Sequence, residues 1–257
     1  MLFRTFAPSA ELRRFVRCYW ILDAPSLPGE SVLPDGCTEI VFQLGHVMKN
    51  RDELGRLHEQ PKAVIVGQML RATTLHSSGR VLSFGVRFQP AGLAPFLRVS
   101  ISELTGSIVE CPFQELQRRI DSSNEVVECI RIADEFFLGR LSRHSVTLAE
   151  AASTEIERSR GVLRIDKLCR NLGVSPRTLQ RSFEREVGIG PKAFARIVRL
   201  QAALRLLDAG EKGAEVAADL GYFDQAHLLH DRKEIVNGAA APRVAFLQDS
   251  IAESRAL

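Results

Sequence analysis

The chain has 257 residues, 45% of them apolar and 25% charged, which is enough for about two globular domains of roughly 100–200 residues each. It contains no run of about 18 apolar residues, and its first residues lack the apolar segment of a signal peptide. We therefore expect neither a membrane-spanning helix nor a secretory leader. Five dispersed cysteines without a CxxC pair predict reduced thiols and a cytoplasmic protein.

The formal net charge of +3 is spread unevenly along the chain. Residues 160–205 contain 11 Lys and Arg against 3 Asp and Glu, whereas residues 206–257 contain 5 basic and 9 acidic residues. A local concentration of basic side chains is typical of a surface that binds a polyanion. A charged surface that only contacts solvent is the alternative interpretation.

Residues 1–90 predict a β-rich domain. A short helix from Ser9 to Val16 is expected before a strand at Cys18–Leu22, and the charged, turn-rich residues Met48–Pro61 are expected to form a long loop. Several short strands with turn residues between them indicate a small antiparallel barrel or sandwich. The other predicted strands, β-branched and aromatic runs bounded by Pro, Gly, Asp and Ser, are Thr38–Leu44, Ala63–Val66, Thr73–His76 and Val81–Phe88.

Residues 91–145 predict a helical layer on this domain or a linker. The helix expected at Val126–Leu141 has an apolar stripe, which either packs on the core or forms a dimer seam. Ser142–Ser145 is the predicted hinge, and Thr147–Ser159 the first helix of a C-terminal domain at 146–257. Shorter helices are expected at Ala91–Phe96, Ser102–Leu104 and Phe113–Ile120.

The segment Ile165–Val187 has the pattern of a helix-turn-helix. Gly173 is suited to end a first helix in the left-handed conformation. Ser175 can cap a second helix that begins at Pro176. The other sides of that second helix are rich in groups that recognise base edges in a DNA groove.

Two arginines and a glutamine on this second helix are the main candidates for reading bases. Arg177 and Arg181 can each present a guanidinium fork to guanine, and Gln180 can pair with adenine. Surface solubility is the alternative role for such residues. The other candidates are Thr178 and Arg185 on the same helix and, as phosphate contacts, Arg170, Lys192 and Arg196.

An internal repeat predicts a second helix-turn-helix. Leu168-Cys169 and Leu172-Gly173 recur 48 residues later as Val216-Ala217 and Leu220-Gly221. A helix at Lys192–Ala209, stopped by Gly210, would fix the two modules near one turn of DNA, about 34 Å, apart. In the second module Gly221 should end the first helix and Asp224 should cap the second, with Gln225, His227 and His230 among its exposed residues.

The segments GVSPRTLQRSFEREVGIGPKAF, RLQAALRLL and VAADLGYFDQAHLLHD together resemble the DNA-binding domain of AraC/XylS-type bacterial transcription regulators. The resemblance covers about 110 C-terminal residues. It implies a sequence-specific regulator, an activator or a repressor, whose two modules read successive major-groove segments of double-stranded DNA. By that pattern Arg177, Gln180 and Arg181 contact DNA from the first module, and Gln225, His227 and His230 from the second.

The N-terminal segments YWILDAP, LPDGCTEIVF and FGVRFQPAG are similar to an uncharacterised domain often fused to such regulators. The sensory halves of these regulators are commonly cupin-like barrels, so the resemblance implies an α+β protein with an effector-binding or dimerisation barrel before an all-α tandem helix-turn-helix domain. Trp20 and Phe42 are the candidates for lining an effector pocket. The implied partners are DNA, a small effector, RNA polymerase and a second copy of the chain, with no cofactor, metal or catalytic residue.

The second module departs from the family pattern. Arg232 stands where the first module has the inward-facing Phe183, and an arginine in a helical core is costly unless it reaches solvent or a partner. Residues 237–242 carry two extra residues before the proline that usually follows. We therefore expect the first module to supply most of the affinity for DNA.

A second class of function is a cupin-like barrel enzyme or metal-binding protein whose C-terminal helices only mediate assembly. His46, His58 and His76 would converge on a metal in such a barrel. Cys37 would be the nucleophile of an enzyme, although no basic residue flanks it and a small buried residue is the simpler interpretation.

Overall fold

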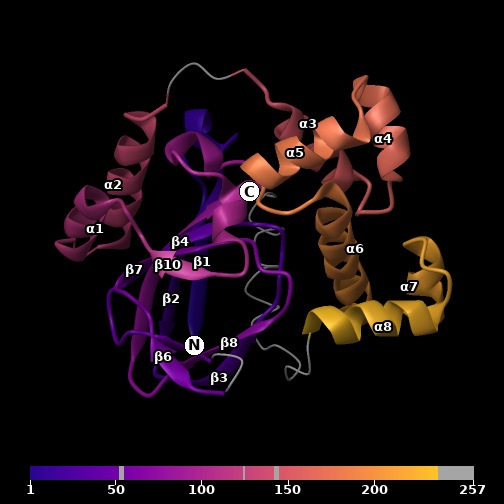
Figure 1. Ribbon diagram of the computed structural model, residues 1–257. Coiled ribbons are helices and arrows are strands. Elements are labelled where there is room, and N and C mark those ends of the chain that lie inside the picture. The colour runs from indigo at the N-terminus through magenta and orange to yellow at the C-terminus, as the bar shows by residue number, and fades with distance from the viewer. Residues whose placement is uncertain (52–54, 124, 142–144, 237–257) are drawn as a thin grey trace.

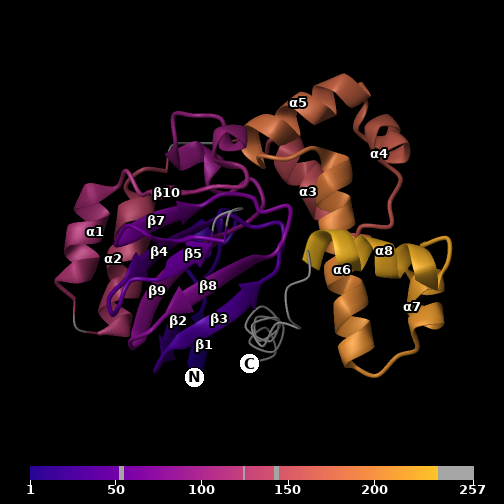
Figure 2. The ribbon, with the colours of Figure 1, turned by 60° about the horizontal axis from the view of Figure 1, so that its bottom comes forward.

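The computed structural model describes residues 1–51, 55–123, 125–141 and 145–236. All its strands lie between residues 2 and 110, and all its α-helices follow residue 113. Figures 1 and 2 show the strands together with α1 (Gln114–Asp121) and α2 (Val126–Leu138) on one side, which we call the sheet domain. The helices from α3 (Leu148–Arg158) to α8 (Gln225–Val236) lie on the other side, and we call them the helical domain. The predicted α+β class is confirmed.

The strands form two antiparallel sheets. Within the described residues, no strand of the smaller sheet pairs with a strand of the larger one, so the barrel of the prediction is not closed. The larger sheet has the order β1 (Leu2–Phe6), β2 (Val16–Ala24), β9 (Val81–Phe88), β4 (Glu39–Gln43), β7 (Ala63–Val66), β10 (Ile108–Glu110). The smaller has the order β3 (Leu27–Val32), β8 (Thr73–Ser77), β5 (Lys49–Arg51), β6 (Leu57–Glu59).

The β5–β6 hairpin corrects the prediction of a loop at Met48–Pro61. Lys49 lies opposite Glu59 in its register, and their ammonium and carboxylate groups are 3.2 Å apart. All three residues of β6 are exposed, so the strand has no buried side from which an alternating apolar pattern could arise. The predicted Ser9–Val16 helix is also shorter in the structure, a single 3-10 turn at Ala10–Leu12 (η1).

Alternate residues of the larger sheet enter two different cores. Tyr19, Phe42 and Phe84 pack with Phe137 and other residues of the helices beside one face. Trp20, on β2 directly after Tyr19, packs on the other face with Leu27 of the smaller sheet. Because successive residues of a strand point to opposite faces, one sheet separates the two cores.

The apolar stripe of α2 is used inside the sheet domain. Ala133 and Phe137 are fully buried in the core, and Ile130 and Leu141 pack against it. The core-packing interpretation of this stripe is therefore confirmed, and the stripe does not form a dimer seam. Residues 142–144, most of the predicted hinge, lie outside the described residues.

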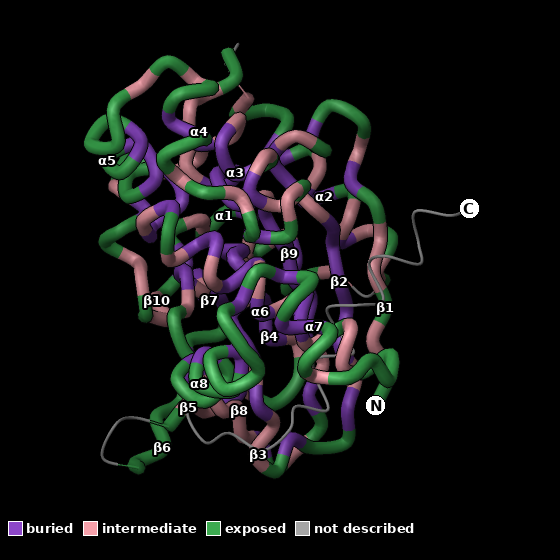
Figure 3. The backbone as a smooth tube through the Cα atoms, turned by 90° about the vertical axis from the view of Figure 1, so that its right-hand side faces the viewer, coloured by how far each residue is buried: buried purple, intermediate pink, exposed green. Residues whose placement is uncertain are grey.

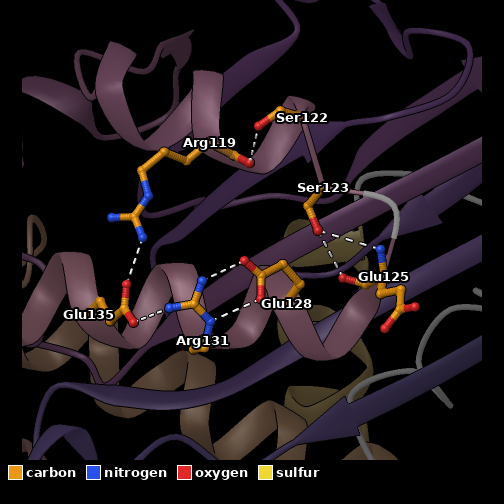
Figure 4. A network of polar contacts seen from close by, with 7 residues as sticks. All are labelled: Arg119, Ser122, Ser123, Glu125, Glu128, Arg131 and Glu135. Atoms are coloured by element: carbon orange, nitrogen blue, oxygen red, sulfur yellow. Dashed lines mark hydrogen bonds and ion pairs between the residues drawn. The ribbon is translucent and has the colours of Figure 1, made fainter.

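The outer side of α1 and α2 carries a chain of ion pairs (Figure 4). Arg131 contacts Glu128 at 2.5 Å and also Glu135, which accepts a further hydrogen bond from Arg119 at 2.6 Å. Between these helices, Ser123 Oγ accepts a 3.4 Å hydrogen bond from the Glu125 backbone amide. These charged side chains are about half exposed, so each pair contributes at most about 1 kcal/mol.

Gly85 on β9 permits the close approach of the Trp20 ring from β2. A Cβ atom at Gly85 would lie 1.9 Å from Trp20 Cε2. We predict that Gly85→Ala lowers the free energy of unfolding by about 1–3 kcal/mol, the usual cost of overpacking. Urea denaturation measures this change. The control Gly139→Ala, at a right-handed helix end with φ −64°, should change stability by less than about 0.5 kcal/mol; equal losses would contradict the steric explanation.

Candidate nucleic-acid interface

The first helix-turn-helix consists of α4 (Ile165–Leu172) and α5 (Pro176–Glu186). Gly173 ends α4 in the left-handed conformation at φ 65°. The Ser175 hydroxyl accepts a 3.1 Å hydrogen bond from the Thr178 amide and so caps α5. Leu179 and Phe183 are fully buried against the rest of the module. The turn and capping residues predicted from the sequence are confirmed.

All five predicted DNA-binding residues of α5 are exposed: Arg177, Thr178, Gln180, Arg181 and Arg185. Three of these side chains have neighbours on their own helix or at its cap. The Thr178 hydroxyl lies 2.8 Å from the Ser175 hydroxyl. Gln180 donates a 2.8 Å hydrogen bond to Glu184, and Arg185 pairs with the buried Glu186. No such contact of the Arg177 or Arg181 side chain is found within the described residues. Arg177 lies in the first turn of the helix and Arg181 in the second.

The second module repeats this geometry with α7 (Gly213–Asp219) and α8 (Gln225–Val236). Gly221 has φ 66°, within a degree of Gly173. Asp224 Oδ1 accepts a 2.7 Å hydrogen bond from the His227 amide, which confirms the predicted cap. Leu228 is buried, as is its counterpart Leu179. The 48-residue repeat in the sequence is therefore a repeat of structure.

The candidates on α8 are exposed but less free than those on α5. Gln225, His227 and His230 all lie on the surface. His227 Nδ1 accepts a 3.4 Å hydrogen bond from the Phe223 amide, and His230 lies 3.3 Å from Glu234. Phe223, in the turn before α8, is 92% exposed. Phe223 was not among the residues predicted to bind DNA. Its place directly before the capping residue Asp224 was the signal in the sequence that could have indicated it.

Arg232 does not enter the core of the second module. Its side chain is exposed, and the buried residue at this level of α8 is Asp231, which is 4% exposed. Asp231 accepts a 2.7 Å hydrogen bond from Arg196 of α6 (Pro191–Asp208) and lies 3.4 Å from Arg199. A buried carboxylate between two arginines thus joins α6 to α8.

Helix α6 connects the two modules. In Figures 1 and 2 it runs from α3–α5 at one end to α7 and α8 at the other. Figure 3 views the molecule from the side of the helical domain. Much of the backbone along α5, in the first module, and along α7 and α8, in the second, is coloured as exposed. Of the predicted phosphate contacts, Arg170 and Lys192 are exposed, whereas Arg196 is held by Asp231 and Glu234.

A groove of about 440 Å³ lies beside the start of α5. Arg177, Arg181 and Arg185 line one side, and Thr147 and Leu148, at the start of α3 (Leu148–Arg158), line the other. Thr147 caps α3, because its hydroxyl accepts a 3.2 Å hydrogen bond from the Glu150 amide. Three guanidinium groups beside a helix N-terminus form a favourable environment for phosphate oxygens.

The sheet domain contacts both modules and the helix between them. Thr105 donates a 2.7 Å hydrogen bond to the carbonyl of Gly188, just after α5. The Ala72 amide donates a 2.8 Å bond to the carbonyl of Ile235 on α8. Gln201 of α6 donates a 2.5 Å bond to the carbonyl of Pro34. The sheet domain therefore helps to set the position of each recognition helix.

Trp20 and Phe42, the predicted effector-pocket residues, do not meet. Trp20 is in the core on one face of the larger sheet, and Phe42 is in the core on the other face. Both rings are surrounded by side chains of the sheet domain, so they cannot line one cavity. The sequence alone could not assign the faces, because the position of each strand in the sheet was unknown.

The residues of the alternative function are also dispersed. His46 and His58 are exposed and His76 is half-buried, and no group of three His, Cys, Asp or Glu in the described residues could hold a metal ion. Burial raises the pKa of the Cys37 thiol well above its ordinary value. A thiol with a raised pKa stays protonated and unreactive at neutral pH.

Comparison with known families agrees with this geometry. Residues 168–238 match a family described as a helix-turn-helix domain. The C-terminal region is an AraC-type helix-turn-helix domain. Residues 4–110 match a family described as a domain of unknown function, DUF6597. With its AraC-type domain, the chain is a DNA-binding transcriptional regulator.

Solved structures are similar to this chain at low sequence identity, and the first one named here shares its fold. An apo point variant of ToxT from Vibrio cholerae is 12% identical, with a TM-score of 0.50 over 90% of this chain and 97% of ToxT. ToxT with a bound unsaturated fatty acid is 12% identical, with a TM-score of 0.49 over 88% and 93% of the two chains. The AraC-like transcriptional activator CuxR is 16% identical, with a TM-score of 0.27 over 81% and 86%. No curated protein sequence matches significantly.

None of the helices in the described part of the chain combines the length and hydropathy that a membrane span requires.

Asp231 should be essential for the packing of the second AraC-type module. Removing a buried ion-pair partner typically costs about 3–5 kcal/mol, and because Arg196 and Arg199 are partly exposed we predict a smaller loss of about 2–3 kcal/mol for Asp231→Ala. Hydrogen exchange should then accelerate in α8 before α5. The control Asp219→Ala breaks the 2.9 Å pair with Arg160, in which both side chains are 49% exposed, and should have little effect. Equal protection of α8 in both variants would contradict this role.

Proposed function

We propose that this protein is a one-component, sequence-specific transcription regulator. The tandem modules bind operator DNA, and the sheet domain responds to a small molecule and changes that binding. The observation that most directly supports the reading of a DNA sequence is the pair of exposed guanidinium groups of Arg177 and Arg181, in the first two turns of α5, for which no bond is found within the described residues. Gln180 and Thr178 lie beside them, so α5 offers both the arginine fork that suits guanine and the amide that suits adenine.

The two modules have unequal roles in this proposal. Three arginines, Arg177, Arg181 and Arg185, line the groove beside α5, whereas the exposed candidates on α8 are an amide and two imidazoles, one of which lies beside Glu234. Because phosphate attraction dominates affinity for DNA, we assign most of the affinity to the first module. The second module adds readout by Gln225, His227 and His230, and Arg170 and Lys192 add phosphate contacts.

The remaining partners follow from the same architecture. We propose a homodimer in the cytoplasm, because two tandem readers on one operator bind more tightly through avidity, and we propose contact with RNA polymerase in activation or repression. We propose no catalysis. Analytical ultracentrifugation with and without operator DNA tests the dimer, and a monomer under both conditions would exclude it.

We predict that Arg177→Ala weakens binding to a duplex selected from a random-sequence library by about 1–3 kcal/mol, the usual value of one bidentate base contact. Gln225→Ala should weaken binding less. Titration by fluorescence anisotropy at several salt concentrations measures both. The control Arg118→Ala, an exposed arginine on α1, should bind as the wild type does.

Salt dependence tests the function itself. Wild-type affinity should fall steeply with ionic strength, because each phosphate contact releases a counterion. If binding is indifferent to salt, or absent, the helical domain is not a DNA reader. If Gln225→Ala weakens binding more than Arg177→Ala, the order of the two modules is reversed.

A further inference from the structure

The turn of the second helix-turn-helix contains one more residue than the turn of the first. Both turns begin in the same way, because Val174 and Tyr222 each donate a backbone hydrogen bond to the preceding helix, at 3.1 and 2.9 Å. Both side chains also point inward: Val174 packs against the core of the first module, and Tyr222 is buried in the core of the second. These two equivalent positions are 48 residues apart in the sequence.

The capping residues of the two recognition helices are 49 residues apart instead. Ser175 caps α5 and follows Val174 directly. Asp224 caps α8, but it is separated from Tyr222 by one residue, which is Phe223. The insertion that shifts the sequence repeat is therefore located in the turn of the second module, at Phe223.

The side chain of this additional residue lies in solvent. Phe223 is 92% exposed, the largest exposed fraction among the large apolar side chains of the described residues. The core position of the turn is already filled by Tyr222, which is 5% exposed. Because removal of a phenyl ring from water is favourable, a partner that covers Phe223 gains affinity from the contact.

The backbone at Phe223 is held by the residues around it. Its amide donates a 3.4 Å hydrogen bond to His227 Nδ1, and the His227 amide donates a 2.7 Å bond to Asp224 Oδ1. The His227 ring also packs edge-on against Tyr222, with ring centroids 5.3 Å apart. The phenyl group is thus attached to an ordered turn directly before the first turn of α8.

This position indicates what covers the ring. In a helix-turn-helix, the N-terminal residues of the recognition helix contact base edges in the major groove, and Phe223 lies two positions before Gln225, the first residue of α8. A phenyl ring cannot donate a hydrogen bond to a phosphate oxygen or a base. The major groove offers it one apolar group, the C5 methyl of thymine, which phenylalanine is suited to contact.

We infer that Phe223 is a specificity-determining residue whose ring contacts the C5 methyl group of a thymine in the groove segment bound by the second module. This inference rests on the proposed function, in which the tandem modules read DNA. It adds an apolar contact to the polar candidates of α8. Such a contact discriminates between bases without adding attraction to phosphate.

Replacement of single thymines by uracil tests the contact, because it keeps the base pair and removes only the methyl group. The probe is a duplex that the wild-type, full-length protein selects from a random-sequence library, and fluorescence anisotropy measures its binding. We expect replacement of at least one thymine to weaken wild-type binding about fourfold, the value of one methyl-sized group in an apolar contact. If no replacement weakens binding, the inference is wrong.

Phe223→Ala links this sensitivity to the phenyl ring. The variant should keep the melting temperature of the wild type, because the ring is exposed and the backbone bond to His227 remains. It should bind the unmodified duplex at least about fourfold more weakly and lose no further affinity when the critical thymine is replaced. Equal sensitivity to uracil in the wild type and in Phe223→Ala would assign the methyl contact to another residue and overturn the inference.

Two further variants act as controls. Phe223→Leu keeps an apolar side chain and should retain part of the sensitivity to uracil. Val127→Ala removes an apolar side chain that is 73% exposed on α2, in the sheet domain, and should keep both the affinity and the uracil sensitivity of the wild type. A loss in Val127→Ala equal to that in Phe223→Ala would show a general effect of apolar surface and overturn the inference.

The salt dependence of binding distinguishes an apolar base contact from a role in phosphate binding. Because a phenyl ring neutralises no phosphate, the slope of log affinity against log salt concentration should be the same in Phe223→Ala as in the wild type. A shallower slope in the variant would mean that phosphate contacts of the second module are lost with the ring. That result would replace base recognition by a docking role and overturn the inference.

Failure of this inference can be told apart from failure of the proposed function. If the wild type selects no duplex, or binds without salt dependence, the proposed function is refuted and the inference with it. If the wild type binds its selected duplex with a steep salt dependence and Phe223→Ala binds it equally well, only the inference is refuted. The exposed ring would then be assigned to a protein partner.

Discussion

The ion pair between Arg14 and Glu150 joins the two domains, together with the pair between Arg17 and Glu157 and with hydrogen bonds to α6, to α8 and to the end of α5. Arg14 follows η1 in the sheet domain, and Glu150 lies in the first turn of α3 in the helical domain. The apolar cores lie within the domains, except that Ala91 from the sheet domain packs into the core of the first module. The domains are joined largely by polar contacts, which can be rearranged at lower cost than a shared core. Such an interface suits a regulator that must change state.

The parts of the fold that could be predicted from the sequence are those determined by residues close together in the chain. Gly173, Ser175, Gly221 and Asp224 determine the turns of both modules through their own conformations and hydrogen bonds, so residues close in sequence were sufficient. The strands at Ala63–Val66 and Val81–Phe88 have the bounds that their apolar residues predicted. The strands β1, β3 and β10 were missed, because their residues are largely half-exposed and give no strong pattern.

What could not be predicted depends on contacts between distant segments. Trp20 and Phe42 were grouped as aromatic residues, but their faces depend on sheet register. Arg232 was placed inside by alignment with Phe183, whereas the fold turns α8 so that Asp231 is buried. Arg13 and Arg205 line the same cavity between the two domains but are 192 positions apart in the sequence, so no local motif indicates that they meet. The base-reading roles of individual residues remain predictions, as does the division at residues 90 and 145.

The bond from the Ala72 amide to the Ile235 carbonyl has a consequence for how the second module moves. Both atoms belong to the main chain, so substitution of either side chain leaves the donor and acceptor in place, proline at position 72 excepted. A displacement of α8 would therefore also displace Ala72, directly before β8, as long as this bond is kept. The position of α8 and that of the smaller sheet are therefore linked through the main chain.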